Sequence, residues 1–313
     1  SLVMFLPESP RWLIKRDRME NARSVLSALS DESEDSELVE QELNIIRDTY
    51  QEEYANSTSV FTMGPERLFH RACLAVLVAL LAQMTGINIV TFYSTQIFED
   101  QLGYSGTEAR IFSGCIQIWQ LLCAGLAVLL IDRFGRRKLL MMGAGGMCVT
   151  QAVLAGLMSD LSNPAAGKAA IAFYFMAMFF FPIGLFLIPF MYAGEISPLS
   201  IRHKVTAMGA CTNWLFNFLI AEVSPPGIQN IGYRYYIVYT CISFAAFVIF
   251  YFFFPETKGR TLEEIDEIFI RSKSIFDPVK VERSLPRGGL AGAERRQEEQ
   301  GLQKSEAAHA ETA

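Results

Sequence analysis

The sequence predicts an all-α membrane protein in which six transmembrane helices follow a cytoplasmic helical insert. Hydrophobic residues make up 51% of the chain and charged residues 19%, whereas soluble domains carry about 25% charged residues. Apolar stretches of about 20 residues, the length that crosses a bilayer as a helix, recur along the chain. The short basic loop Asp132–Lys138 lies between two of them. Because Lys and Arg concentrate on the cytoplasmic side, this loop orients both neighbouring spans.

The first element is the helical insert, which we place at residues 7–70 on the cytoplasmic side. Asp17–Leu29 and Asp35–Tyr54 have apolar residues at helical spacing, which is typical of short amphipathic helices packed against other helices. The stretch 31–53 is strongly acidic, with Arg47 as its only cation. No basic stripe is available to meet phosphates, so we expect no nucleic-acid partner.

Six spans make up the predicted transmembrane bundle, residues 71–254. Cations lie at 132–138, at 202–204 and after the last span, so these segments and both termini are expected in the cytoplasm. A cytoplasmic helical region, 255–283, and a disordered tail, 284–313, complete the chain. The spans run approximately over Leu74–Phe98, Ala109–Ile131, Leu139–Met158, Ala169–Tyr192, Val205–Val223 and Tyr235–Phe254.

Polar side chains interrupt the first span. Gln83, Asn88 and Tyr93 cannot share one narrow helical face, but Gly86 lets the helix bend and present several of them inward. Amides inside a membrane are costly unless they face a bundle interior or a cavity. They offer both donors and acceptors, which suits a neutral polyhydroxyl ligand. The same residues could instead only join helices, and the sequence leaves both interpretations open.

Two later spans have features of a bending or binding element. Pro182 and Pro189 lie inside the fourth span and remove backbone hydrogen bonds there. With Phe190 next to Pro189, this element is a moving gate or a static kink. In the fifth span, Asn213 and Asn217 are four residues apart and share a helical face, with the amphipathic Trp214 beside them.

The sequence does not indicate chemistry other than binding. No Asp or Glu lies near the middle of a span, so the six spans supply no proton-coupling carboxylate. The six cysteines lie in or beside apolar segments without metal-ligand spacing, and the three histidines lie outside the apolar cores. We therefore expect no catalytic residue, no metal site and no cofactor, and we do not expect an enzyme.

Charged residues gather where the predicted spans meet the cytoplasmic side. Stability is a poor reason for so many, since an exposed ion pair contributes about 0–1 kcal/mol. A network that forms when helix ends converge could favour one of two conformations. Alternatively, the charges form a solvated rim that sets only the topology. The candidate inner-gate network comprises Glu8, Arg11, Asp132, Arg133, Arg136, Arg137, Glu195, Arg202 and Glu256.

Five motifs follow one another along the chain. They are Pro7-Glu8-Ser9-Pro10-Arg11, Gln83-x-x-Gly86-x-Asn88, Asp132-Arg133-x-Gly135-Arg136-Arg137, Glu195-x-x-Pro198-x-x-x-Arg202 and Pro255-Glu256-Thr257-Lys258-Gly259. In this order and spacing they resemble the motifs of the sugar porter branch of the major facilitator superfamily, with the character of fungal hexose and related sugar transporters. The resemblance covers about Pro7 to Phe269 and implies the C-terminal half of a twelve-helix fold, preceded by the intracellular insert. Residues 1–6 would then end a preceding transmembrane helix, and an N-terminal six-helix half would be missing.

The resemblance also implies a substrate-binding role for the matched residues of the spans. Gln83 and Asn88 match amides that bind sugar hydroxyls, and Phe92 with Tyr93 matches an aromatic pair that helps to close the outer gate. The inner wall of the cavity is matched by Asn213, Trp214 and Asn217.

Three positions differ from the residues usual in that family. Ala82 replaces one glutamine of a pair, Gln120 replaces an asparagine in the second span, and Phe190 replaces a tryptophan that stacks beneath the sugar. A lost hydrogen bond changes the free energy by about 0.5–1.5 kcal/mol. Other polyols, disaccharides and related organic molecules therefore stay open as substrates.

The resulting expectation is transport of a sugar, a monosaccharide in the first instance, across the plasma membrane by alternating access. The expected partners are the sugar, the lipid bilayer and the missing N-terminal half, with protons as a candidate coupling ion. Alone, this chain would expose its amides to lipid, so we expect it not to transport by itself. A sugar sensor with a transporter fold and a non-transporting fragment are the alternatives.

Overall fold

A computed structural model of the chain describes residues 7–30, 32–34, 36–37, 39–44, 46–47, 59–100, 102–160, 164–198 and 200–285, and every regular element within them is a helix. The chain divides into two compact units, residues 1–59 with 199–201 and the remainder. The predicted helix end at 1–6 and nearly all of the predicted tail lie outside the described residues, as does part of the predicted helix 35–54.

The first unit is built from short amphipathic helices. Helix α1 (Pro10–Lys15) begins after Ser9, whose Oγ accepts from the N–H of Trp12 at 3.3 Å, and α2 (Met19–Ser30) follows. Helix α2 agrees with the helix predicted over Asp17–Leu29. The apolar faces form a small core of Leu13, Ile14, Ala22, Leu26, Val39 and Leu43.

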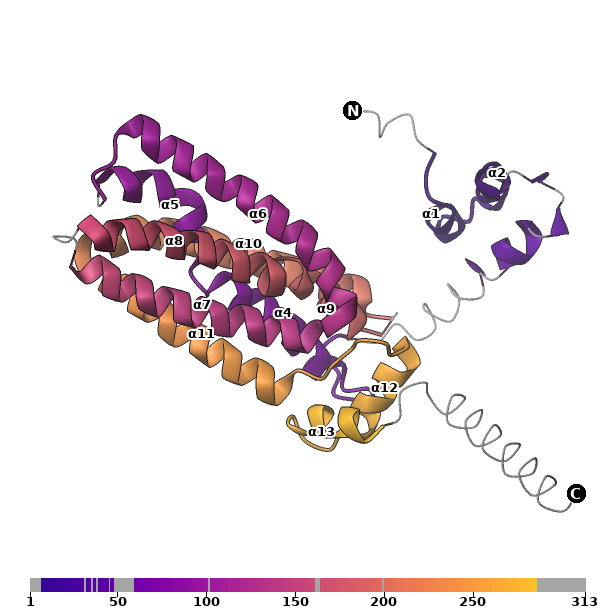
Figure 1. Cartoon of the computed structure of the whole chain (residues 1–313). Helices are drawn as coiled ribbons and strands as arrows, with labels where there is room; N and C mark the ends of the chain where they lie inside the picture. Colours follow the sequence, from indigo (N-terminus) through magenta and orange to yellow (C-terminus); the bar gives the residue numbers. More distant parts are fainter. Residues whose placement is uncertain are drawn as a thin grey trace, which may run out of the picture. The chain divides into compact units, whose positions relative to one another are not determined.

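The second unit contains the long helices of the predicted bundle (Figure 1). The first predicted span is two helices, α4 (Leu68–Gln83) and α5 (Ile87–Asp100). They are separated at Gly86, which has a φ of +83°, and a Cβ there would lie 2.6 Å from Cγ of Tyr239. The span is therefore broken where Gly86 predicted a bend, and α4 begins before the predicted Leu74.

Helices α6 (Gly106–Phe134) and α7 (Arg136–Ser159) contain the second and third predicted spans. Ser105 and Glu108 form a capping box at the start of α6, with the Glu108 N–H donating to the Ser105 Oγ at 3.4 Å. Only Gly135, with a φ of +93°, separates α6 from α7. The segment predicted as a loop, 132–138, thus consists mainly of two helix ends.

The fourth predicted span contains the expected irregularity. It comprises α8 (Pro164–Phe181), one π-helical turn η2 (Pro182–Phe186) and α9 (Ile188–Glu195). The backbone of η2 packs directly on α7, because a Cβ on Gly184 would lie 2.3 Å from the carbonyl oxygen of Leu139 and 2.7 Å from Cα of Gly143. π-Helical turns of this kind occur at functional sites and bends.

Helices α10 (Arg202–Ile231) and α11 (Arg234–Phe253) complete the bundle. The predicted end of the fifth span at Val223 is wrong, because α10 continues through Pro225 and Pro226 to Ile231. Within the described ranges, five helical segments are long and apolar enough to cross a membrane, and α10 is not among them. Its charged first turn, its asparagines and its prolines lower its hydropathy, although it packs against α4 and α9 as a full bundle member.

Two short helices, α12 (Leu262–Arg271) and α13 (Asp277–Ser284), follow the bundle. They lie at the end where α6 stops and α7 starts (Figure 1), which we call the charged end. Arg71 on α4 pairs with Asp266 on α12 and lies over the ring of Phe269 at 4.4 Å. Arg67 donates to the carbonyl oxygen of Ser274 at 2.6 Å, so the start of α4 holds α12 in place.

Candidate functional site

Four amide side chains from α4, α5 and α10 form one hydrogen-bonded cluster. Gln83 Nε2 donates to Oδ1 of Asn213 at 2.7 Å, and Asn88 Nδ2 donates to Oε1 of Gln83 at 2.9 Å. Asn217 Nδ2 approaches Oδ1 of Asn88 at 3.3 Å and Oε1 of Gln83 at 3.5 Å. Gln83 ends α4 and Asn88 lies in the first turn of α5, so the break at Gly86 turns both amides towards α10.

The amide cluster is shielded but chemically adaptable. Gln83, Asn88 and Asn213 are 8%, 4% and 8% exposed, and Asn217 is half-buried. Each amide has two N–H donors and a carbonyl acceptor, and the mutual bonds use only part of this capacity. The cluster can therefore bind several hydroxyl groups by exchanging its own hydrogen bonds for new ones.

Tyr93 forms a second hydrogen-bonded contact between α5 and α10. Its hydroxyl donates to the carbonyl oxygen of Ala221 at 2.7 Å. In a regular helix this carbonyl accepts from the residue four positions later, but that residue is Pro225, which has no N–H. Tyr93 thus satisfies the acceptor that the proline leaves unpaired, which explains how α10 remains helical there.

The other predicted substrate-binding residues do not take part in the hydrogen bonds of the amide cluster among the described residues. Phe92, Phe190 and Trp214 are exposed, and Gln120 on α6 is half-buried. Among the described residues, no hydrogen bond joins Gln120 to the amide cluster. The structure thus brings four predicted amides together and leaves the three aromatic side chains accessible.

Two further amides were missed by the sequence analysis. Gln117 on α6 donates from Nε2 to the carbonyl oxygen of Thr91 at 3.4 Å, and Gln151 on α7 donates in the same way to Thr85 at 3.4 Å. Gln151 is fully buried, and within the described part of the chain its Oε1 has no partner. Glutamines inside otherwise apolar spans were the available signal, since such groups are costly there.

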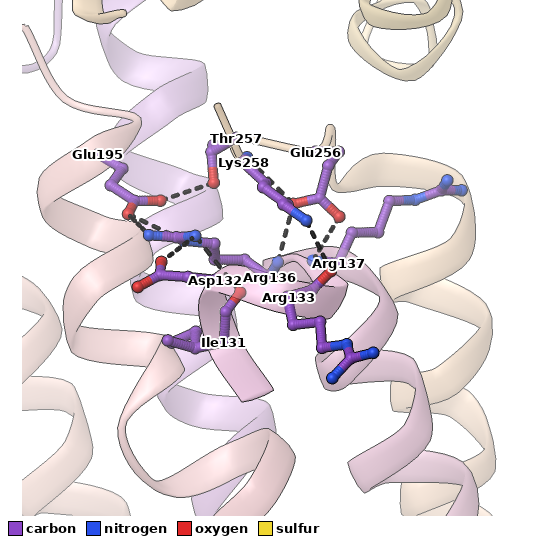
Figure 2. A network of polar contacts seen from close by, with 9 residues as sticks. All are labelled: Ile131, Asp132, Arg133, Arg136, Arg137, Glu195, Glu256, Thr257 and Lys258. Atoms are coloured by element: carbon purple, nitrogen blue, oxygen red, sulfur yellow. Dashed lines mark hydrogen bonds and ion pairs between the residues drawn. The ribbon is translucent and has the colours of Figure 1, made fainter. Parts of the chain in front are cut away.

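The charged end holds an ion-pair network centred on Arg136 (Figure 2). The Arg136 guanidinium pairs with Glu195 at the end of α9 at 2.9 Å and with Asp132 near the end of α6 at 3.1 Å. Glu195 also accepts from the Thr257 hydroxyl at 2.6 Å. Three helix ends and the segment after α11 are therefore joined through two residues.

Glu256 caps the start of α7 in the same region (Figure 2). Its carboxylate accepts from the backbone N–H groups of Arg136 at 2.8 Å and Arg137 at 3.2 Å. The carboxylate lies so close to Gly135 that a Cβ on that residue would be 2.6 Å from it. A negative charge at a helix N-terminus is favourable, and only glycine leaves room for it here.

The remaining predicted network residues have other contacts. Arg137 donates to the carbonyl oxygen of Tyr251 at 2.6 Å, and Arg202 donates to that of Ser197 at 3.1 Å. Arg133 contributes its carbonyl oxygen, which accepts from Lys258 Nζ at 2.6 Å. Glu8 is exposed in the first unit, and the side chain of Arg11 lies outside the described part of the structure.

Known proteins resemble this chain in sequence and in fold. Residues 1–269 match the family described as "Sugar (and other) transporter". The MFS-type transporter oryC of Aspergillus oryzae is 33% identical over 98% of this chain and 59% of its own length. The sugar transporter STL1 of Saccharomyces cerevisiae is 32% identical over 94% of this chain and 52% of its own length.

Solved structures agree with these sequence matches. The proton:xylose symporter XylE bound to 6-bromo-6-deoxy-D-glucose superposes with a TM-score of 0.67 at 26% identity, covering 86% of this chain and 55% of XylE. The chain thus spans about half the length of the relatives that it matches.

Proposed function

The chain belongs to the sugar porter family of the major facilitator superfamily, and from this we propose that it is part of a transporter that moves a sugar across a membrane by alternating access. The observation that carries the proposal is the amide cluster of Gln83, Asn88, Asn213 and Asn217. Uncharged donors and acceptors on facing helices suit the hydroxyl groups of a neutral sugar and offer no counter-charge to an ion.

The substrate class follows from the cluster together with the relatives. STL1 is described as a sugar transporter, HXT3 of Saccharomyces cerevisiae as a low-affinity glucose transporter and XylE as a proton:xylose symporter. We propose a monosaccharide or a related polyol as substrate. Phe92, Phe190 and Trp214 are accessible and are proposed to supply apolar faces against the sugar ring, as aromatic side chains do in binding sites.

The charged end is proposed to face the cytoplasm and to act as the inner gate. Its basic residues favour this orientation, and it would place both termini of the chain in the cytoplasm. The pair between Arg136 and Glu195 joins α7 to α9, and α9 follows the π-helical turn that breaks the fourth span. An ion pair that exists only while the helix ends converge stabilises the inward-closed conformation relative to the inward-open one.

The complete carrier is proposed to include six further transmembrane helices, since the relatives are about twice as long. Protons are the proposed coupling ion by analogy with XylE. The carboxylate that exchanges them would come from those further helices, because no Asp or Glu lies near the middle of a span in this sequence. We also propose a plasma-membrane location, because the chain resembles fungal sugar transporters.

Uptake of radiolabelled sugars tests this proposal. The protein that the native transcript encodes is produced in yeast cells that lack their own hexose carriers, and Asn88→Ala is compared with the unaltered protein. We expect sugar uptake that Asn88→Ala reduces at equal protein abundance. Absence of uptake for hexoses, pentoses and polyols alike, with the protein correctly inserted, would contradict transport and favour a receptor.

A further inference from the structure

Two pockets at the charged end share Arg283 and differ in chemistry. The first, of about 490 Å³, lies between the start of α7, the segment after α11 and α13, and it is lined by Arg137, Lys138, Glu256, Arg260, Glu282 and Arg283. The second, of about 390 Å³, lies between the end of α11 and α13, and it is lined by Tyr251, Phe252, Phe276, Val279, Lys280 and Arg283.

The first pocket has an excess of positive charge. Its two carboxylates are already used, since Glu256 accepts the first N–H groups of α7 and Glu282 pairs with Arg260 at 3.2 Å. Lys138 and Arg283 are exposed, and neither forms an ion pair with any described residue. The pocket is therefore attractive to an anion.

Buried guanidinium groups strengthen this attraction. The Arg260 side chain is 2% exposed, and its Nε and Nη1 have no hydrogen-bond partner among the described residues. Arg137 is also buried, and within the described part of the chain its Nε has no partner and its Nη2 donates only to the backbone carbonyl of Tyr251. A buried positive charge is costly unless it is compensated, so a negative group in the pocket would offset this cost.

The second pocket provides an apolar surface next to the cationic one. Phe253 at the end of α11 contacts the ring of Phe276 at 4.7 Å between centroids, which brings α13 against the membrane-spanning helix. Arg137 of the first pocket lies over the ring of Tyr251 of the second at 5.3 Å. Cationic and apolar surfaces therefore meet at the end of α11, which is long and apolar enough to cross a membrane, and the end of such a helix is expected near the lipid headgroups.

We propose that these two pockets together bind one phospholipid with an anionic headgroup. The phosphate and the headgroup carboxylate or second phosphate lie in the first pocket beside Lys138 and Arg283, and the upper part of an acyl chain covers Phe252 and Phe276. A soluble phosphate would use only the first pocket. The adjoining apolar surface at the end of a spanning helix favours the lipid.

Native mass spectrometry of the detergent-purified full-length protein tests the site. The probes are phosphatidylserine and, as the uncharged comparison, phosphatidylcholine. The double variant Lys138→Ala/Arg283→Ala is compared with Lys204→Ala/Lys273→Ala, which removes two exposed cations from the same end outside both pockets. We expect the first variant to weaken phosphatidylserine binding by about fivefold per removed charge and the second to leave binding unchanged.

Two further measurements distinguish binding of a lipid from binding of a soluble anion. Phe252→Ala, which removes an exposed ring of the second pocket and keeps the contact between Phe253 and Phe276, should weaken phosphatidylserine binding while the protein keeps its melting temperature. Inorganic phosphate should not displace the lipid at equal concentration. Equal weakening by both charge variants, equal retention of phosphatidylcholine, or displacement by inorganic phosphate would each overturn the proposal. The assay measures binding directly, so its result does not depend on whether the protein carries a sugar.

Discussion

Gln83 and Asn213 lie 130 residues apart, and the Nε2 of the first donates to the Oδ1 of the second at 2.7 Å. This bond joins the end of α4, where the first span is broken, to the middle of α10. Both residues are buried within the bundle. A ligand that enters the amide cluster therefore competes with the contact that holds these two helices together, which links substrate binding to their relative position.

Removing an amide from the cluster should weaken substrate binding. Asn213→Ala removes the acceptor for Gln83, and we expect the KM for sugar uptake to rise about twofold to tenfold, the range for one hydrogen bond. Asn217→Ala should have a smaller effect, because the Asn217 contacts are longer, at 3.3 and 3.5 Å. Thr212→Ala is the matched control on α10, since Thr212 bonds only its own helix at Met208. A control as impaired as Asn213→Ala would point to a general defect in α10.

Tyr93→Phe should destabilise the protein through the carbonyl of Ala221, because that group then lies unpaired beside Pro225. An unsatisfied buried acceptor costs about 1–3 kcal/mol, which should appear as a lower melting temperature in detergent. Tyr104→Phe is the control, since no hydrogen bond of the Tyr104 hydroxyl occurs among the described residues. Combining Tyr93→Phe with Pro225→Ala restores an N–H donor and should recover much of the loss. No recovery in the double variant would contradict this explanation.

Gly86→Ala should be among the most damaging single substitutions in the bundle. The residue has a φ of +83°, and its Cβ would lie 2.6 Å from the ring of Tyr239. Strain from the left-handed conformation costs about 1–2 kcal/mol and overpacking about 1–3 kcal/mol. Gly232→Ala separates the two effects, because Gly232 also has a positive φ but nothing within 4 Å of its Cβ position. Thermal unfolding should therefore show a larger loss for Gly86→Ala, and equal losses would remove Tyr239 from the explanation.

Glu195→Gln should loosen the charged end more than Asp132→Asn does. Both carboxylates pair with Arg136, but the Asp132 side chain is 80% exposed, whereas the Glu195 side chain is 25% exposed and also accepts from Thr257. Exposed pairs contribute about 0–1 kcal/mol, and hydrogen bonds to charged groups about 1.5–3 kcal/mol. Hydrogen exchange of the backbone amides of residues 256–258 should be faster in Glu195→Gln by about tenfold. Faster exchange in Asp132→Asn than in Glu195→Gln would instead show that Asp132 is the more important partner of Arg136.

Glu256→Ala should destabilise the start of α7, because two backbone N–H groups lose their acceptor. Loss of such a cap costs about 0.5–2 kcal/mol, which thermal unfolding in detergent can detect. Glu256→Gln keeps one acceptor oxygen without the charge and should be intermediate. A Gln variant as unstable as the Ala variant would show that charge, and not the hydrogen bonds, stabilises this helix end.

The sequence predicted the spans and several side-chain relationships because their causes are local. Apolar length gives a spanning helix, Gly86 permits a break, and the spacing of Asn213 and Asn217 places both on one face of α10. The partners of that face could not be predicted from spacing, since they depend on how α10 rotates against α4. The amide contact between Gln83 and Asn213 is therefore a result of tertiary packing.

Other differences arose where a distant residue replaced a missing local interaction. The fifth span was predicted to end at Val223, yet α10 continues past Pro225 because Tyr93, far away in sequence, satisfies the freed carbonyl. Asp132–Lys138 was predicted as a loop, yet α7 begins at Arg136 because Glu256 supplies its cap. The sequence identified Glu256 as a charged residue of this region, but its use of backbone N–H groups is visible only in the structure.

The contact between Gly143 and Gly184 determines which part of the fourth span is free to move. The two backbones pack directly on each other there, so we expect α7 and η2 to move together. Any swing of the fourth span must then pivot beyond η2, near Leu187, and α9 becomes the lever. Glu195 is at the tip of that lever, about 12 Å from Leu187 at 1.5 Å per residue, and Arg136 is on the fixed body. A swing of about 15° at the pivot therefore moves the tip by about 3 Å and separates the ion pair.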